Sequence, residues 1–429
     1  MGYKNSIFNV FETHNSKEYL VNTFSQSVVM LLPEEAERIK ELLKLSSPEN
    51  EKEEEYIRVL VENDFLVPTE KNELSWLEYR YNKRWFDSKQ LNLLFLPTLR
   101  CNFSCPYCFE SEKDLDMDER RLEVFIQWLT TEMVIRKTIN ISFFGGEPLL
   151  KLPYVEKICT SLNAKAKETK CTLFYSLVSN AYLLTEPVAK TLLLELGFRG
   201  FQITFDGPAA FHDKRRKMHS GAPTFASVLA NTKMLMRIAG EYAISDMALA
   251  IRVNYDDETL EDIEEFLRLF SDEEKKLCTI YFRKLYNTDR WASKAADRIE
   301  LRTLYALAKS YGFTLSTMVQ SSFVYCECDG GAGQLTVLPD LSVWKCANDY
   351  SYKEARVGCI NAKTELELDE EKMMRWGEKN PFKDERCRAC AYVPICVGSC
   401  PLAWSKERKR TCFYDKANLV DVLLVNNEI

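Results

Sequence analysis

Cysteine is the residue type whose number and spacing stand out in this chain of 429 residues. The chain has 15 cysteines and 3 histidines, and no cysteine precedes Cys101. Three lie at Cys101, Cys105 and Cys108, and nine fall between Cys326 and Cys412. Clustered thiols usually ligate metal, and soft thiolate ligands select zinc or iron–sulfur clusters. With so few histidines, the ligands must be almost entirely thiolate.

The chain has the composition of a globular protein. Hydrophobic residues make up 46% and charged residues 28% of the sequence, and we find no window of about 18 apolar residues that would indicate a membrane span. The first ten residues contain Lys4, Asn5 and Asn9, which do not suit a secretory signal. We therefore expect a cytoplasmic protein with no membrane partner.

The elements that precede the first cysteines predict where these residues lie. Apolar runs at residues 93–96, 139–144, 173–178, 200–205, 248–254 and 279–282 alternate with stretches of helical spacing, such as 122–134 and 187–196. This alternation predicts parallel βαβ units of an α/β barrel, whose functional residues lie at the carboxyl ends of the strands. Cys101 follows the first of these strands, and Gly145-Gly146-Glu147-Pro148 follows the second.

The spacing Cys101-x3-Cys105-x2-Cys108, with Tyr107 before the last cysteine and the later Gly-Gly-Glu-Pro, resembles the radical S-adenosylmethionine (SAM) superfamily. The resemblance implies a partial (β/α)6 barrel. Three thiolates would hold a [4Fe–4S] cluster whose fourth iron binds SAM, and the cluster would cleave SAM to a 5′-deoxyadenosyl radical. Gly145 and Gly146 would allow close approach to the SAM amino group, Glu147 would be its carboxylate partner and Tyr107 would lie by the adenine. A glycine turn beside a structural zinc site is the alternative.

Further residues follow the order of that family. Ser179-Asn180-Ala181 stands where members often have Thr-Asn-Gly, so the geometry of this loop is an open question. The stretch from Gln202 through Asp206 to Arg216 resembles the one that holds the ribose and carboxylate of SAM. The resemblance therefore predicts the following SAM contacts: Ser179, Asn180, Thr204, Asp206, Arg216 and Arg252. No residue is identified as a general base.

The C-terminal cysteines resemble the SPASM extension of peptide-modifying radical SAM enzymes. That resemblance implies two auxiliary [4Fe–4S] clusters, one held by Cys328, Cys346 and Cys400 and the other by Cys387, Cys390, Cys396 and Cys412. Cys326 would be the fourth ligand of the first cluster, unless an open iron there binds a substrate thiolate. Zinc competes for these thiols. Leu341 replaces a glycine that is usual before Cys346, and Cys159, Cys171, Cys278 and Cys359 are expected to be buried thiols.

The first 80 residues read as a module of their own. Short strands near 7–11, 19–21, 28–32 and 65–67 and helices from Pro33 and at 51–62 predict a winged-helix-like fold. The module has 9 basic and 16 acidic residues, which argues against nucleic acid as a partner. The element order and Tyr19-Leu-Val-Asn-Thr23 resemble the PqqD-like recognition element that binds the leader of a ribosomally made precursor peptide.

These features predict three domains, at residues 1–80, 81–324 and 325–429. They predict a radical SAM peptide maturase that takes electrons from an external donor such as flavodoxin or ferredoxin and forms thioether crosslinks from peptide cysteines. The alternatives are a carbon–carbon or carbon–oxygen crosslink, or an anaerobic sulfatase-maturating enzyme. The sulfatase-maturating relatives place an aspartate after the second auxiliary cysteine, where this chain has Ala347. A zinc-ribbon and winged-helix adaptor is the non-enzymatic alternative.

Overall fold

The computed structural model describes residues 2–14, 16–45, 48–108, 114–285, 298–315, 331–347, 350, 352–398, 401–407, 420 and 423–425. These residues form two compact units. The larger contains the described residues of 86–315 and 331–377, and the smaller those of 2–85 and 378–425. None of the described helices is both long and apolar enough to cross a membrane.

The larger unit is built on one sheet of eleven strands, in the order β12-β11-β10-β9-β8-β7-β6-β13-β14-β15-β16. All pairs from β12 to β13 are parallel, and β14 to β16 continue the sheet in antiparallel fashion. The strands are β6 (Gln90–Phe95), β7 (Thr138–Phe143), β8 (Thr172–Ser179), β9 (Phe198–Phe205), β10 (Ala248–Tyr255), β11 (Thr279–Lys284), β12 (Thr314–Leu315), β13 (Gln334–Val337), β14 (Ser342–Trp344), β15 (Arg356–Ile360) and β16 (Leu366–Leu368). All six strands predicted from the sequence are present.

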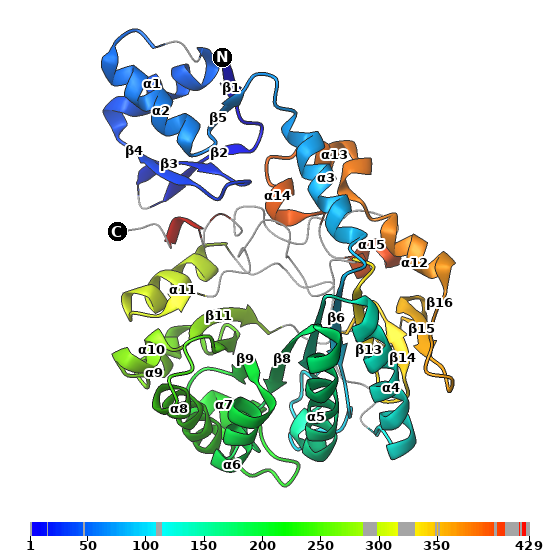
Figure 1. Ribbon diagram of the computed structural model, residues 1–429. Coiled ribbons are helices and arrows are strands. Elements are labelled where there is room, and N and C mark those ends of the chain that lie inside the picture. Colours follow the sequence, from blue (N-terminus) through cyan, green and yellow to red (C-terminus); the bar gives the residue numbers. More distant parts are fainter. Residues whose placement is uncertain are drawn as a thin grey trace. The chain divides into compact units, whose positions relative to one another are not determined.

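Helices follow the parallel strands and lie along their outside (Figure 1). They are α4 (Glu119–Ile135), α5 (Leu152–Thr169), α6 (Glu186–Lys190) with a π-helical turn (Thr191–Leu196), α7 (Ala209–Arg215), α8 (Phe225–Glu241), α9 (Ile263–Leu267), α10 (Asp272–Lys276) and α11 (Arg298–Ser310). Helix α12 (Glu370–Gly377) instead follows the antiparallel strand β16. Single 3₁₀ turns occur at Pro148–Lys151, Leu260–Asp262 and Lys353–Ala355. The mostly parallel α/β architecture confirms the predicted fold class.

Alternation along the strands separates an apolar face from a polar one. On β7, Ile139, Ile141 and Phe143 are buried, while Asn140 and Ser142 between them are half-buried. The buried set packs with the helices, and the Phe95 and Phe125 rings stack at 4.0 Å between β6 and α4. Successive strand residues point to opposite faces, so the polar residues of β7 to β11 share the other face of the sheet.

The smaller unit contains the N-terminal module. Strands β2 (Asn9–His14), β3 (Lys17–Asn22) and β4 (Val28–Leu31) form an antiparallel sheet, and β1 (Tyr3–Asn5) pairs separately with β5 (Leu66–Pro68). Helices α1 (Pro33–Leu45) and α2 (Glu51–Glu62) begin where the sequence predicted, and Asn50 caps α2 by accepting from Glu53 N. Leu20, Ile39, Leu43 and Leu60 belong to one shared core. The β1–β5 pair was not anticipated.

Helix α3 (Glu73–Trp85) follows this module in the sequence and packs against the cysteine-rich end of the chain, which belongs to the same unit. That end contains a 3₁₀ turn (Pro381–Lys383), α13 (Glu385–Arg388), α14 (Val393–Cys396) and α15 (Pro401–Glu407). The Tyr81 ring packs edge-on against Phe382, with centroids 5.6 Å apart. Thr23 donates to the backbone oxygen of Ala391, and the Tyr392 hydroxyl donates to Glu12 at 2.9 Å. The N-terminal module therefore contacts the residues that directly follow Cys390.

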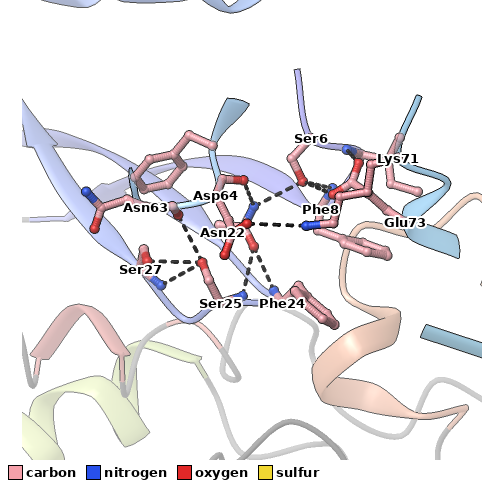
Figure 2. Close-up of polar contacts among 12 residues, drawn as sticks. Ser6, Phe8, Asn22, Phe24, Ser25, Ser27, Asn63, Asp64, Lys71 and Glu73 are labelled. Atoms are coloured by element: carbon pink, nitrogen blue, oxygen red, sulfur yellow. Dashed lines mark hydrogen bonds and ion pairs between the residues drawn. The ribbon is translucent and has the colours of Figure 1, made fainter. Parts of the chain in front are cut away.

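Asn22 is the hub of a buried polar network in the N-terminal module (Figure 2). Its amide nitrogen donates to Ser6 Oγ at 3.0 Å and to the Asp64 backbone oxygen at 2.9 Å. Its side-chain oxygen accepts from the backbone nitrogens of Phe24 and Ser25 at 2.9 and 3.0 Å. Ser6 in turn donates to Glu73 at 2.6 Å, at the start of α3. One amide thus joins the β1–β2 connection, the turn after β3 and the residues before β5.

Replacing Asn22 with leucine should lower the free energy of unfolding of the smaller unit by about 2–3 kcal/mol, because several buried partners would lose their hydrogen bonds. Chemical denaturation followed by hydrogen exchange within residues 2–85 would measure this loss. The Asn63 side chain is half-buried and donates only to Val59 O of the preceding helix, so Asn63→Ala should cost no more than about 1 kcal/mol. Equal losses in both variants would contradict the role of Asn22.

Candidate active site

The loop that carries Cys101, Cys105 and Cys108 follows β6 and is held from two sides. Thr98 forms an isolated antiparallel bridge with Asp116, and Phe103 forms another with Met218, beyond α7. The Ser104 backbone nitrogen donates to Lys217 O at 2.9 Å. The three cysteines therefore lie at the carboxyl end of the first barrel strand, as predicted.

The two glycines after β7 allow their loop to touch the backbone that leads into Cys101. Gly145 has a φ of +115°, and a Cβ there would lie 2.3 Å from Thr98 O. A Cβ on Gly146 would lie 2.1 Å from Arg100 O. Hydrogen bonds from Gly146 N to Thr98 O (3.2 Å) and from Glu147 N to Arg100 O (2.8 Å) join the two loops. Any larger residue would separate them.

Glu147 is fully buried and joins the ends of β7 and β8. Its carboxylate accepts from Leu149 N at 3.0 Å, from Ser179 Oγ at 3.0 Å and from Asn180 N at 2.9 Å. Burial raises the pKa of Glu147 to about 7, although these donors and the Arg216 charge act in the opposite direction. The carboxylate predicted to contact the cofactor is therefore engaged by donors of the chain itself.

The loop after β8 keeps a glycine-like conformation without a glycine. Ala181 has a φ of +60° and is buried. The Asn231 amide donates to the backbone oxygens of Ala181 and Tyr182, at 2.8 and 3.1 Å. The left-handed region costs an alanine roughly 1 kcal/mol, and the packing of this loop offsets that cost. Replacement of the family's glycine has thus left the turn in place.

Tyr107 and Asp206 meet in a second buried polar group. The Tyr107 hydroxyl lies 2.7 and 2.8 Å from the two carboxylate oxygens of Asp206. Asn254 donates to Asp206 at 3.0 Å, and Arg216 Nη1 donates to the Tyr107 oxygen at 3.2 Å. Burial raises the pKa of Asp206. The Nε of Arg216 is buried without a hydrogen-bond partner among the described residues, so a donor remains for a ligand.

Thr204 and Arg252 are register partners on β9 and β10, on the polar face of the sheet. Arg252 Nε donates to Asn254 Oδ1 at 2.9 Å, and burial lowers the pKa of Arg252. Asn254 was absent from the predicted contacts. It lies two residues after Arg252, so strand alternation would have placed it on the same face.

The first three cysteines offer three thiols on one loop, a number that would leave one iron of a [4Fe–4S] cluster open. None of the three is in a disulfide. Burial, and then the charges of Glu147 and the other two thiols, raise the pKa of Cys101 to about 12. No three cysteine, histidine or acidic side chains within the described residues already converge as a metal site. A bound metal would stabilise the thiolates that burial and mutual repulsion disfavour.

The C-terminal cysteines are only partly described. Cys346 is buried after β14, and Leu341 before it has a φ of +64°, so a leucine occupies the turn where the family has a glycine. Cys387, Cys390 and Cys396 are half-buried cysteines on and beside α13 and α14, and none of them is in a disulfide. Cys326, Cys328, Cys400 and Cys412 lie outside the described residues. Cys159, Cys171 and Cys278 are buried as expected, whereas Cys359 is half-buried.

Comparison with known proteins identifies the domain that carries these residues. Residues 95–270 match the radical SAM superfamily. The chain is 22% identical over 400 residues to the radical SAM cyclopropyl synthase TigE of Paramaledivibacter caminithermalis, covering 86% of this chain and 80% of TigE. It is 25% identical over 344 residues to a cysteine-type anaerobic sulfatase-maturating enzyme of Clostridium perfringens, covering 72% and 88% of the two chains.

Among solved structures, Streptococcus suis SuiB bound to its precursor peptide SuiA has the same fold. The TM-score is 0.52 at 14% identity, and the match covers 96% of this chain and 100% of SuiB. The superfamily match spans the strand ends that carry Cys101 to Cys108, the Gly145-Gly146-Glu147 loop and Arg216. Residues 95–270 of this enzyme are therefore a radical SAM domain, and the chain is related in sequence to TigE and to the anaerobic sulfatase-maturating enzymes.

Proposed function

We propose that this enzyme modifies a ribosomally made precursor peptide by hydrogen abstraction and forms thioether crosslinks from peptide cysteines. The observation that carries the proposal is the contact of the N-terminal module with the segment after Cys390, through Thr23 with Ala391 and Glu12 with Tyr392. The N-terminal module, which would bind the leader, belongs to the same compact unit as Cys387, Cys390 and Cys396, which would bind an auxiliary cluster. The relative SuiB, solved with its precursor peptide, supports a peptide substrate.

Bound SAM and a reduced cluster would supply the 5′-deoxyadenosyl radical that removes a hydrogen atom from the peptide. A peptide thiol would lose its proton as its sulfur bonds to the resulting carbon radical, and an auxiliary cluster would accept the electron that this step releases. The residues present fit this role. Cys101, Cys105 and Cys108 would hold the cluster, and the free Nε of Arg216 would face the SAM carboxylate. The Gly145-Gly146 loop would close against the cysteine loop and exclude water. Two auxiliary [4Fe–4S] clusters would bind at the C-terminal cysteines, with Cys326 as the fourth ligand of the first, and reduced flavodoxin or ferredoxin would be the external donor.

The mass and the thiol content of the product peptide test whether a thioether forms. Anaerobic incubation of the enzyme with SAM, a reductant and a cysteine-bearing precursor should lower the peptide mass by roughly two hydrogens per crosslink and consume one alkylatable thiol each. Fragmentation mass spectrometry would place each crosslink. The enzyme without SAM is the control. The same mass loss with every thiol still alkylatable would contradict the thioether.

A carbon–carbon bond is the second candidate, and the relation to the cyclopropyl synthase TigE favours it. The same measurement separates the two, because a carbon–carbon bond leaves all thiols free. Sulfatase maturation is less favoured. The residue after Cys346 is Ala347, a buried apolar side chain, where those relatives place an aspartate. Asp349 lies outside the described residues.

The leader should add to the β4 edge of the N-terminal sheet. Strand β4 is an outer strand. Met30 lies within it and Leu32 directly follows it, and these side chains are 45% and 43% exposed. The other outer strand, β2, carries the Glu12 contact with Tyr392. Backbone addition with apolar side-chain contacts is a common mode of peptide recognition. Met30→Glu and Leu32→Glu together should weaken leader binding roughly tenfold or more.

Fluorescence anisotropy of a labelled leader with the full-length enzyme would measure this change. Cleavage of SAM without peptide should persist in the double variant, because the change lies in the smaller unit. Phe86 is an exposed apolar residue of the larger unit, at 71%, and Phe86→Glu is the matched control. Unchanged leader affinity in the Met30 and Leu32 variant would place the leader elsewhere.

A further inference from the structure

The sulfur of Cys101 receives two hydrogen-bond donors from the protein. The Phe103 backbone nitrogen lies 3.4 Å from Cys101 Sγ, and the amide nitrogen of Asn180 lies 3.7 Å from the same sulfur. The first donor is local to the cysteine loop. The second comes from the end of β8, 79 residues away in sequence. Tertiary structure thus places a side-chain donor against one thiol of the SAM-cluster site.

The orientation of the Asn180 amide is fixed by its other contacts. Its side-chain oxygen accepts from Tyr182 N at 2.9 Å, so that position must be the oxygen and the NH₂ group must face the cysteine loop. The NH₂ group also donates to Asn102 Oδ1 at 2.7 Å. Its backbone nitrogen donates to Glu147 at 2.9 Å. Asn180 is 6% exposed and cannot turn away without losing several of these bonds.

Asn102 also carries a buried amide donor that has no acceptor among the described residues. It directly follows Cys101, and its Oδ1 is occupied by Asn180. Its Nδ2 is buried with no hydrogen-bond partner among the described residues. A buried amide donor is rarely left without an acceptor. Asn102 and Asn180 thus bring more amide donors to the cysteine loop than the described residues offer acceptors for. An anionic, sulfur-rich group bound there would supply the missing acceptors.

We propose that Asn180 is a positioning residue that raises the reduction potential of the SAM-binding cluster by donating a hydrogen bond to the Cys101 sulfur. One-electron reduction adds negative charge that spreads onto the thiolate ligands. A donor to such a sulfur stabilises the reduced state more than the oxidised state, which raises the potential. Asn102 supports this role by holding the Asn180 amide at its other hydrogen. Asn180 therefore acts through Cys101.

The test is a potentiometric titration of the reconstituted full-length enzyme with dithionite and mediators, followed by electron paramagnetic resonance. The signal of this cluster is the one missing from the variant that lacks Cys101, Cys105 and Cys108. Asn180→Leu removes the donor and should shift the midpoint to a more negative potential. Asn180→Asp keeps the acceptor for Tyr182 N but loses the amide donor, and it should shift the midpoint the same way. Asn180→Asp is the variant to measure if Asn180→Leu does not bind the cluster.

Asn231→Leu is the matched control. Asn231 supports the same loop from the other side, through the backbone oxygens of Ala181 and Tyr182, and neither of these bonds involves Cys101. Its midpoint should match that of the wild type. An unchanged midpoint in both Asn180 variants would overturn the proposal, including the case in which only their affinity for SAM falls. An equal shift in Asn231→Leu would also overturn it, because the effect would then come from the loop.

Discussion

Replacing Cys101, Cys105 and Cys108 together with alanine should abolish cleavage of SAM. The three thiols share one loop at the carboxyl end of β6, and the charges of Cys105 and Cys108 contribute to raising the pKa of Cys101. Without them no thiolate remains on that loop to hold iron, whereas the cysteines after residue 325 are untouched. If those hold two four-iron clusters, the variant should retain about two thirds of the iron. Iron analysis and the release of 5′-deoxyadenosine would measure both effects.

Cys159→Ala is the control for this variant. Cys159 is a buried thiol on α5, and its loss removes a thiol from the chain without touching the cysteine loop. Its iron content and SAM cleavage should equal those of the wild type. Retained SAM cleavage in the triple variant would refute the assignment of this loop. Stoichiometric zinc in place of iron would refute the C-terminal clusters.

Replacing Glu147 with glutamine should change how stability depends on pH. The unfolded carboxyl has an ordinary pKa of 4.5, and burial raises the pKa of folded Glu147 to about 7. Between these values the folded state holds a proton that the unfolded chain has released. The free energy of unfolding therefore falls as pH rises through this window, by about 3 kcal/mol in total for this group. Above pH about 7 the group contributes no further slope.

The glutamine variant cannot titrate, so its free energy of unfolding should lack this fall. Denaturation of both proteins at several pH values from 4.5 to 7.5 gives the difference directly. Shifts common to both proteins, such as those of Asp206 and His212, cancel in the comparison. Glu132→Gln is the control, because that carboxylate is also buried but pairs with Arg136 at the end of α4. Parallel pH profiles of the wild type and Glu147→Gln would show that folding does not raise the pKa of Glu147.

The sequence by itself determined the fold of the larger unit and where its chemistry lies. Apolar runs of strand length alternate with amphipathic helices, and this pattern depends only on local residue order. The barrel strands, helices α1 and α2, and the position of Cys101 to Cys108 after β6 all followed from it. Charge counting also separated the acidic N-terminal module from the rest of the chain.

Only the tertiary structure decided what each site residue contacts. Gly145 and Gly146 contact the backbone before Cys101, Glu147 bonds the end of β8, and Tyr107 bonds Asp206 and Arg216. These partners lie on different strands, and a hydrogen bond over a long sequence separation leaves no periodic signal in the sequence. Ala181 and Leu341 show the same limit. Packing holds both residues at positive φ, a conformation that neither alanine nor leucine would predict from its residue type alone. The contact of Tyr392 with Glu12 spans 380 residues, so only folding could bring the cysteine-rich end against the N-terminal module.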